Sequence, residues 1–304
     1  MANITAQMVK ELREITGAGM MDCKKALQEV DGDTEKAIDV LREKGLSKAA
    51  KKADRIAAEG LVAIKINSDN TVASVVEVNS ETDFVAKNDD FKTFVADTAE
   101  LALNTNATEL AGFLAENHSS GVALSDHLNN LIAKIGEKLD IRRFEKISTN
   151  GQVAGYIHGG GKIGVLVELD TQARDEKVLA LGKDVAMQVA AMNPKYVSRD
   201  EVDAEYIAHE TEVLKQQAIN EGKPANIVEK MVVGRLEKEL KEVCLLEQTF
   251  VKNPDLTVKQ LVAQVAKEVG SDINVVRVVR FEVGEGIQKR EENFAEEVAK
   301  QLKN

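Results

Sequence analysis

The first 46 residues carry apolar positions at helical spacing in three successive runs. Thr5 can cap the first run, and a pair of glycines separates it from the second, which we expect to begin at Asp22. An Asp-Gly-Asp turn leads into the third run, which we expect to end before Gly45. The pattern predicts a compact three-helix module over residues 1–46 and a short helical linker, rich in Ala and Lys, over residues 47–59.

From residue 60 onward the apolar pattern repeats. The run that starts at Gly60 matches the run that starts at Gly151, 91 residues later, whereas the closing segments of the two copies lie 134 residues apart. Each copy begins with two alternating patterns typical of antiparallel strands, continues with helical patterns and ends in a returning strand. We therefore predict an α+β fold with two similar core subdomains, residues 60–148 and 149–283.

The two copies differ in length, because the second holds about 43 additional residues. The first copy has helical patterns near residues 90–103, 107–116 and 125–136. In the second copy, residues 198–246 add two long amphipathic patterns joined by a Gly-Lys-Pro turn, which predicts an inserted antiparallel helical hairpin. We expect the apolar stripes of this arm to pack on each other or on another chain.

A C-terminal helical module is predicted over residues 284–304. Phe294, Val298 and Leu302 are spaced by four and form a single apolar stripe on an otherwise charged helix. Such a stripe indicates docking on a surface, either of this chain or of another.

Residues 82–88 lie where the second predicted strand of the first copy gives way to a helix, and they place Phe84 directly beside Asp83. Thr82 or Asp83 can act as the N-cap of the helix that carries Phe91. Two interpretations of Phe84 stay open. Its side chain folds back as a hydrophobic staple on the following helix, or it stays exposed as an anchor for a partner's pocket, with Asp83 as a polar probe.

Two adjacent methionines, Met20 and Met21, pose a similar choice in the helical module. Both cannot face one small core. Either one packs in the core while the other is exposed by chance, or the pair offers a flexible apolar contact to a partner helix.

Composition and charge favour a protein partner. With 40 basic and 51 acidic residues the chain has a net charge of -11, which argues against a nucleic-acid groove. Cys23 and Cys244 lie in separate predicted units, so we expect no disulfide and a reducing compartment. No apolar run approaches the ~20 residues of a membrane span, and Met1 leads into a helical pattern without a signal sequence. We expect a soluble cytoplasmic protein.

The chain lacks the motifs of covalent or metal chemistry. The glycines after His158 are spaced somewhat like a phosphate-binding loop, but the residue after Lys162 is Ile163, where such a loop needs Ser or Thr. These glycines join two predicted strands, so a hairpin turn is the better interpretation. Two acidic runs lack the glycine of a calcium loop, and the four histidines have no metal-ligand spacing. We expect no catalytic site, no metal and no cofactor.

Two long runs, residues 16–27 and 82–88, closely resemble the two signatures of the bacterial translation elongation factor Ts family, in the expected order. The resemblance continues through His158, residues 163–166 and residues 280–286, so it covers essentially the whole chain. It implies an N-terminal module of the ubiquitin-associated type, a coiled-coil arm at the inserted hairpin and a C-terminal module that packs on elongation factor Tu.

The resemblance also implies a function, that of a guanine-nucleotide exchange factor that binds the GTPase elongation factor Tu and promotes GDP release during translation elongation. Phe84 then wedges between helices of the GTPase domain near its magnesium site, and Asp83 perturbs the network that holds the ion. The corner at residues 135–136 adds a second contact, Arg13 and the two methionines grip a helix near the nucleotide pocket, and His158 meets another domain. The residues assigned to partner contact are Thr82, Asp83, Phe84, Val85, Arg13, Met20, Met21, Ile135, Gly136 and His158.

Other functional classes stay open. A binding scaffold with no effect on nucleotide exchange has the same modules, and an enzyme is the class that the sequence supports least. The hairpin arm either joins two copies of this chain or touches the GTPase, so a homodimer and a two-plus-two complex are both open. Neither nucleic acid nor a membrane is expected as a partner.

Overall fold

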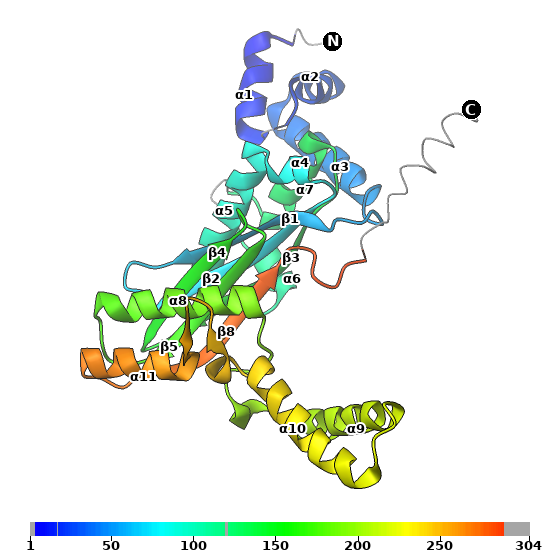
Figure 1. Ribbon diagram of the computed structural model, residues 1–304. Coiled ribbons are helices and arrows are strands. Elements are labelled where there is room, and N and C mark those ends of the chain that lie inside the picture. Colours follow the sequence, from blue (N-terminus) through cyan, green and yellow to red (C-terminus); the bar gives the residue numbers. More distant parts are fainter. Residues whose placement is uncertain (1–3, 17, 119–120, 289–304) are drawn as a thin grey trace. The chain divides into compact units, whose positions relative to one another are not determined.

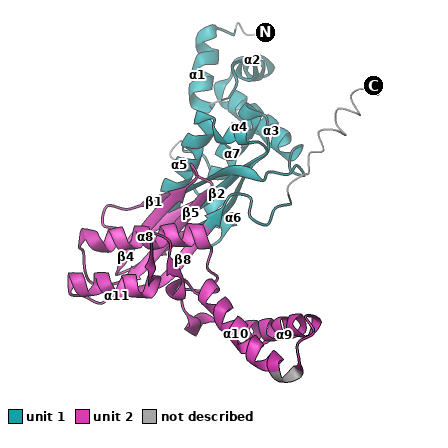
Figure 2. Ribbon diagram, in the orientation of Figure 1, with its two compact units in different colours: residues 1–63, 76–144, 281–304 teal, residues 64–75, 145–280 magenta. Residues whose placement is uncertain are grey.

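The computed structural model describes residues 4–16, 18–118 and 121–288 (Figure 1). The chain divides into two compact units (Figure 2). Unit 1 comprises residues 1–63, 76–144 and 281–304, and unit 2 comprises residues 64–75 and 145–280. The predicted stripe of Phe294, Val298 and Leu302 lies outside the described residues. The division into a helical module, a linker, two core subdomains and a C-terminal module stays a prediction.

Three helices form the N-terminal part of unit 1, namely α1 (Ala6–Thr16), α2 (Met20–Glu29) and α3 (Thr34–Ala50). Their apolar faces meet in a small core in which Leu12 and Leu27 are fully buried. Thr5 caps α1, since its hydroxyl accepts a hydrogen bond from the Met8 amide at 3.2 Å. The three predicted helices and the Thr5 cap are confirmed.

Two predicted helix boundaries in this region are wrong. Helix α2 begins at Met20, and Asp22 lies in its first turn. Helix α3 continues through Gly45 to its end at Ala50 because this glycine packs against α7 (Leu124–Ile135). A β-carbon on Gly45 would come within 3.5 Å of the Asn130 side chain. Such a distance is an ordinary van der Waals contact, so Gly45 lies inside α3 where this helix packs against α7, and it does not end the helix.

The first copy of the repeat contains a three-stranded sheet in which β2 (Val72–Ser80) lies between β1 (Glu59–Ile66) and β3 (Leu139–Ser148). Its helices are α4 (Asp83–Ala86), α5 (Asp89–Asn104), α6 (Leu110–Leu114) and α7. The three helices predicted in this copy are confirmed as α5, α6 and α7, whereas the four-residue α4 was not predicted. Phe91, Phe94 and Phe113 fill the core between these helices and the sheet.

The second copy has the same strand order, with β5 (Ile163–Asp170) between β4 (Gln152–His158) and β8 (Asn274–Glu282). Strands β4 and β5 pair antiparallel, from Gln152 opposite Leu169 to His158 opposite Ile163. Helix α8 (Glu176–Met192) packs on β4 and β5, and α11 (Val258–Val269) packs on α8 (Figure 1). The short strands β6 (Thr249–Phe250) and β7 (Asn253–Thr257) form a separate antiparallel pair. Helices and small antiparallel sheets thus make an α+β fold, as predicted.

The predicted helical hairpin consists of α9 (Ala204–Asn220) and α10 (Ala225–Val243), flanked by 3-10 turns at Arg199–Glu201 and Leu245–Glu247 (Figure 1). The two helices bury Leu214, Ala218, Val228 and Val232 against each other. Ile207, Ile219, Ile227 and Val233 stay exposed along the arm. Helix α10, like every other described helix, is too short or too polar to cross a membrane.

Glycines at equivalent positions of the two copies make the same close backbone contact. A β-carbon on Gly60 would lie 2.1 Å from the carbonyl oxygen of Val78, and one on Gly151 would lie 2.0 Å from that of Leu169. Both residues of the second pair follow those of the first by 91 positions, as predicted. Gly136 and Gly270, which are 134 positions apart, end α7 and α11 in the left-handed conformation with φ of 88° and 67°.

The copies diverge between their second strand and the helix that follows. Asn88 caps α5 and Asp175 caps α8, and these residues are 87 positions apart, whereas the strands are 91 apart. The first copy therefore has four more residues at this junction. Helix α4, which carries Asp83 and Phe84, also has four residues.

A buried carboxylate on β2 connects three segments of unit 1. Glu77 on β2 is fully buried and binds Arg142 at 3.0 Å and Arg143 at 2.6 Å, both on β3. Its Oε1 also accepts a hydrogen bond from the Gly284 amide at 2.8 Å, after the end of β8. The backbone at Gly284 has φ of 72°, and a β-carbon there would lie 2.2 Å from the Ala58 carbonyl oxygen. Unit 1 thus joins segments that are far apart in the sequence around one charge.

Replacing Glu77 with Gln should lower the free energy of unfolding by about 3 kcal/mol, because two arginines lose a charged partner inside the protein. The matched control is Glu168→Gln, at the equivalent position of the second copy, where the side chain is only half-buried. We expect that control to cost less than about 1 kcal/mol. Urea unfolding followed by circular dichroism measures both, and equal losses would contradict the assigned role of Glu77.

Candidate functional site

Phe84 lies on α4 and is 78% exposed. The next residue, Val85, packs in the core of unit 1, and Ala86 is also buried. The staple interpretation of Phe84 is therefore wrong, and its exposed position is confirmed. An aromatic ring in water beside two buried neighbours is typical of an interface anchor.

The helix that carries Phe91 is capped by Asn88, whose side chain accepts a hydrogen bond from the Phe91 amide at 3.2 Å. Thr82 precedes α4, yet its hydroxyl donates to Oε1 of Glu137 at 2.9 Å instead of capping a helix. The predicted cap by Thr82 or Asp83 is therefore wrong, because α4 separates these residues from α5. Glu137 was not predicted as part of this site.

Lys87 links the two side chains at the tip of α4. Its Nζ lies 2.6 Å from Oδ2 of Asp83 and 5.6 Å from the centroid of the Phe84 ring. The Asp83 carboxylate is about half exposed, at 49%. The tip therefore presents an aromatic face and a carboxylate whose charge is partly balanced by an exposed ammonium group.

The corner at the end of α7 lies beside this tip. Phe84, Val85 and Ile135 line an open depression of about 380 Å³, together with Asn88, Asp90 and Lys134. Gly136 ends α7 directly after Ile135. The structure thus brings residues 82–85 together with residues 135–136, which are about fifty positions apart in the sequence.

The N-terminal module presents a second apolar patch. Met20 and Met21 are 60% and 62% exposed, so neither packs in the core of the module. Ile15, which was not predicted as a contact residue, is exposed to the same extent at the end of α1, and Arg13, two residues before it, is also exposed. The interpretation with one buried methionine is wrong, and both side chains are available for contact.

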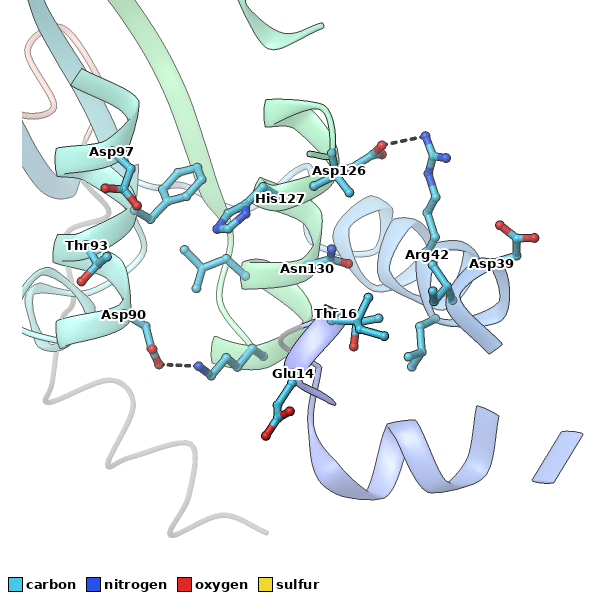
Figure 3. Close-up of a pocket in the computed structure, with 17 residues that line it drawn as sticks. Glu14, Thr16, Asp39, Arg42, Asp90, Thr93, Asp97, Asp126, His127 and Asn130 are labelled. Atoms are coloured by element: carbon cyan, nitrogen blue, oxygen red, sulfur yellow. Dashed lines mark ion pairs between the residues drawn. The ribbon is translucent and has the colours of Figure 1, made fainter. Parts of the chain in front are cut away.

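A cavity of about 440 Å³ lies within unit 1 among α1, α3, α5 and α7 (Figure 3). Five carboxylates line it, Glu14, Asp39, Asp90, Asp97 and Asp126. Asp126 pairs with Arg42 at 2.6 Å and Asp90 pairs with Lys134 at 2.7 Å, as the dashed lines in Figure 3 mark. Asp90 and Lys134 also line the depression at Phe84, so this ion pair lies on both surfaces.

His127 forms an aromatic wall of this cavity. Its ring stacks on Phe94 with centroids 5.3 Å apart and lies 4.2 Å from the ring of His118. Burial lowers the pKa of His127, and His118 lowers it further, whereas Asp97 opposes the shift. The imidazole is therefore neutral near pH 7. Among the described side chains, no group of three or more His, Cys, Asp or Glu residues is arranged to hold a metal ion.

His158 lies at the exposed end of β4, with its Nδ1 3.0 Å from the hydroxyl of Tyr156. The three glycines that follow have φ of 59°, 65° and 100°, and they turn the chain into β5. The predicted hairpin turn is confirmed, and the segment opens no helix that could bind a phosphate. His158 belongs to unit 2, whereas the other nine predicted contact residues belong to unit 1.

Comparison with known proteins gives a consistent result over the whole chain. The sequence model of the family described as "Elongation factor TS" matches residues 81–285. The chain is 82% identical to elongation factor Ts of Clostridioides difficile (strain 630) over 303 residues, which cover 100% of both chains. It is 56% identical to elongation factor Ts of Clostridium tetani (strain Massachusetts / E88) over 98% of this chain and 99% of that protein.

Replacing Phe84 with Ala should change the free energy of unfolding by less than about 0.5 kcal/mol, because the ring is exposed. Replacing the fully buried Phe91 with Ala should cost about 3 to 5 kcal/mol. Urea unfolding of the two variants beside the wild type provides the measurement. A large loss for Phe84→Ala would mean that the ring supports the fold.

Acid should destabilise the protein through His127. The pKa of His127 is lowered in the folded state, so the unfolded chain binds the proton more readily below about pH 6.5. The free energy of unfolding therefore decreases as the pH decreases. We expect the melting temperature to drop less between pH 7.5 and pH 5.5 in His127→Asn than in the wild type. The control His209→Asn, at an exposed position on α9, should behave as the wild type. Identical pH profiles for all three proteins would refute this assignment.

Proposed function

This chain belongs to the elongation factor Ts family, and we propose that it is a guanine-nucleotide exchange factor that binds elongation factor Tu and promotes GDP release during translation elongation. We propose that it acts in the cytoplasm and makes or breaks no covalent bond. The observation that carries this proposal is Phe84, an aromatic side chain that is 78% exposed on a tip whose next two residues are buried.

The mechanism is thermodynamic coupling between two ligands of the GTPase. A protein that binds the nucleotide-free GTPase more tightly than the GDP-bound form weakens GDP binding by the same factor. Each tenfold acceleration of release requires about 1.4 kcal/mol of contact energy that is realised as the nucleotide leaves. Burying an exposed Phe contributes roughly 1.5 to 3 kcal/mol. Phe84 alone can therefore account for an acceleration of about tenfold to a hundredfold.

The other contact residues have distinct proposed roles. Asp83 perturbs the network that holds the magnesium ion of the GTPase, while Thr82 and Val85 hold the tip. Ile135, which lines the same depression, adds an apolar contact together with Gly136 directly after it. Arg13, Met20 and Met21 bind a helix of the GTPase through the exposed patch of the N-terminal module. His158 contacts a further domain of the partner.

The exposed residues of α9 and α10 leave two proposed arrangements of the complex. Ile207, Ile219, Ile227 and Val233 give the arm an apolar surface that its own hairpin does not cover. This surface contacts either the GTPase or a second copy of this chain, which corresponds to a one-to-one or a two-plus-two complex. The mass of the complex in solution distinguishes these arrangements.

The test is the release of a fluorescent GDP analogue from elongation factor Tu at fixed magnesium, with substoichiometric amounts of this protein. We expect faster release with turnover, a loss of about tenfold to a hundredfold in Phe84→Ala, and a smaller loss in Asp83→Ala. The matched control is Val251→Ala, which truncates another exposed apolar residue in unit 2 and should keep the wild-type rate.

Two results would refute the proposal. Unchanged GDP release despite a stable complex would identify a binding scaffold without exchange activity. Equal rates for the wild type, Phe84→Ala and Asp83→Ala would refute the wedge mechanism even if the protein accelerates release.

A further inference from the structure

Two segments on either side of the Phe84 depression exchange hydrogen bonds through carboxylates. Glu137 accepts from the Thr82 amide at 3.1 Å and from the Thr82 hydroxyl at 2.9 Å. In the opposite direction, Glu81 accepts from the Lys138 amide at 2.5 Å. We call these four residues, Glu81, Thr82, Glu137 and Lys138, the carboxylate clasp.

The clasp is fastened to a third segment of unit 1. The guanidinium of Arg55 lies 3.3 Å from Oε1 of Glu81. The Lys138 ammonium donates to the carbonyl oxygens of Ala53 at 2.7 Å and of Arg55 at 2.9 Å. Both arms of the clasp are therefore held by the chain that leads from α3 into β1.

The clasp fixes the two elements that line the depression. Thr82 precedes the first residue of α4, and Glu137 follows Gly136 at the end of α7. A helix of four residues has too few internal hydrogen bonds to be stable alone. Since the carboxylate of Glu137 satisfies both donors of Thr82, it sets where α4 starts and thus where Phe84 points.

The second copy of the repeat lacks the clasp. The positions equivalent to Glu81 and Thr82, 91 residues later, are Gln172 and Ala173, and the position equivalent to Glu137, 134 residues later, is Ser271. There Asp175 caps α8 directly by accepting from the Lys177 amide at 2.8 Å. The α+β unit thus folds without a clasp, which accompanies only the copy that carries the four additional residues of the Phe84 tip.

We infer that Glu137 is a positioning residue of the exchange reaction, whose carboxylate holds the tip of α4 so that Phe84 meets the GTPase in one orientation. The inference rests on the proposed function. Pre-organisation of an anchor saves the cost of ordering it when the complex forms. Glu137 therefore acts on exchange only through the tip that carries Phe84.

The test is a double-mutant cycle of Glu137→Gln and Phe84→Ala in the full-length chain, measured as release of the fluorescent GDP analogue from elongation factor Tu. Gln keeps the shape of Glu137 but can accept from only one of the two Thr82 donors. We expect Glu137→Gln to slow release about threefold to tenfold in the wild-type background and to have no further effect beside Phe84→Ala. The matched control is Glu116→Gln, which alters a carboxylate of unit 1 that accepts from the Thr105 hydroxyl, and it should leave release unchanged.

A second measurement needs no GTPase. Hydrogen exchange of the isolated protein should show faster exchange at the amides of residues 82–87 in Glu137→Gln than in the wild type, with equal melting temperatures. An unchanged release rate in Glu137→Gln would overturn the inference. It would also be overturned if Glu137→Gln slowed release as much in the Phe84→Ala background as in the wild type, because Glu137 would then contact the partner directly. If the wild type itself does not accelerate release, the proposed function fails instead, whatever the hydrogen exchange shows of the clasp.

Discussion

The carboxylate of Glu77 has no access to water, and unit 1 depends on the partners that surround it. An ionised carboxylate costs several kcal/mol to bury unless opposite charges and hydrogen-bond donors replace its water. Arg142 and Arg143 of β3 supply the charges, and the Gly284 amide, 207 positions away from Glu77, supplies a further donor. Strand β2, strand β3 and the segment after β8 therefore have to meet at one point. That requirement, together with the apolar core, holds the frame on which α4 and the corner after α7 are built.

On this frame the two copies of the repeat have diverged in different places. The second copy inserts the hairpin of α9 and α10, and it connects β5 to α8 by a direct cap at Asp175. The first copy has no such arm, but it has four additional residues between β2 and α5, and these carry Phe84 into solvent. Paired glycines such as Gly60 and Gly151 preserve the close strand contacts of both copies. A duplicated α+β element thus keeps its packing while each copy gains a different projecting surface.

The sequence was sufficient to predict features that depend on local periodicity or on comparison of the two copies. Helices α5 to α7, the hairpin arm and the succession of strands and helices along each copy follow from apolar spacing and from the offsets of 91 and 134 residues. Features that depend on distant contacts were missed. Gly45 ends no helix because α7 lies against it. The Thr82 side chain caps no helix because its hydroxyl donates a hydrogen bond to Glu137, 55 positions later. In both cases the deciding contact is made by a residue or helix far away in the sequence, which a local pattern cannot predict. For Thr82 and Glu137 the sequence did contain a signal, because the equivalent positions of the second copy hold neither Thr nor Glu.

The construction of the tip bears on how binding energy can be used. An exposed aromatic on a mobile loop would lose much of its contact energy to the ordering of that loop in the complex. Here Val85 and Ala86 are buried below Phe84, Asn88 caps the helix that follows, and Glu137 holds the residue before α4. The ordering of the tip is completed when the chain folds. Under the proposed function, more of the free energy from burying Phe84 is then available to distort the partner GTPase, which is what nucleotide exchange requires.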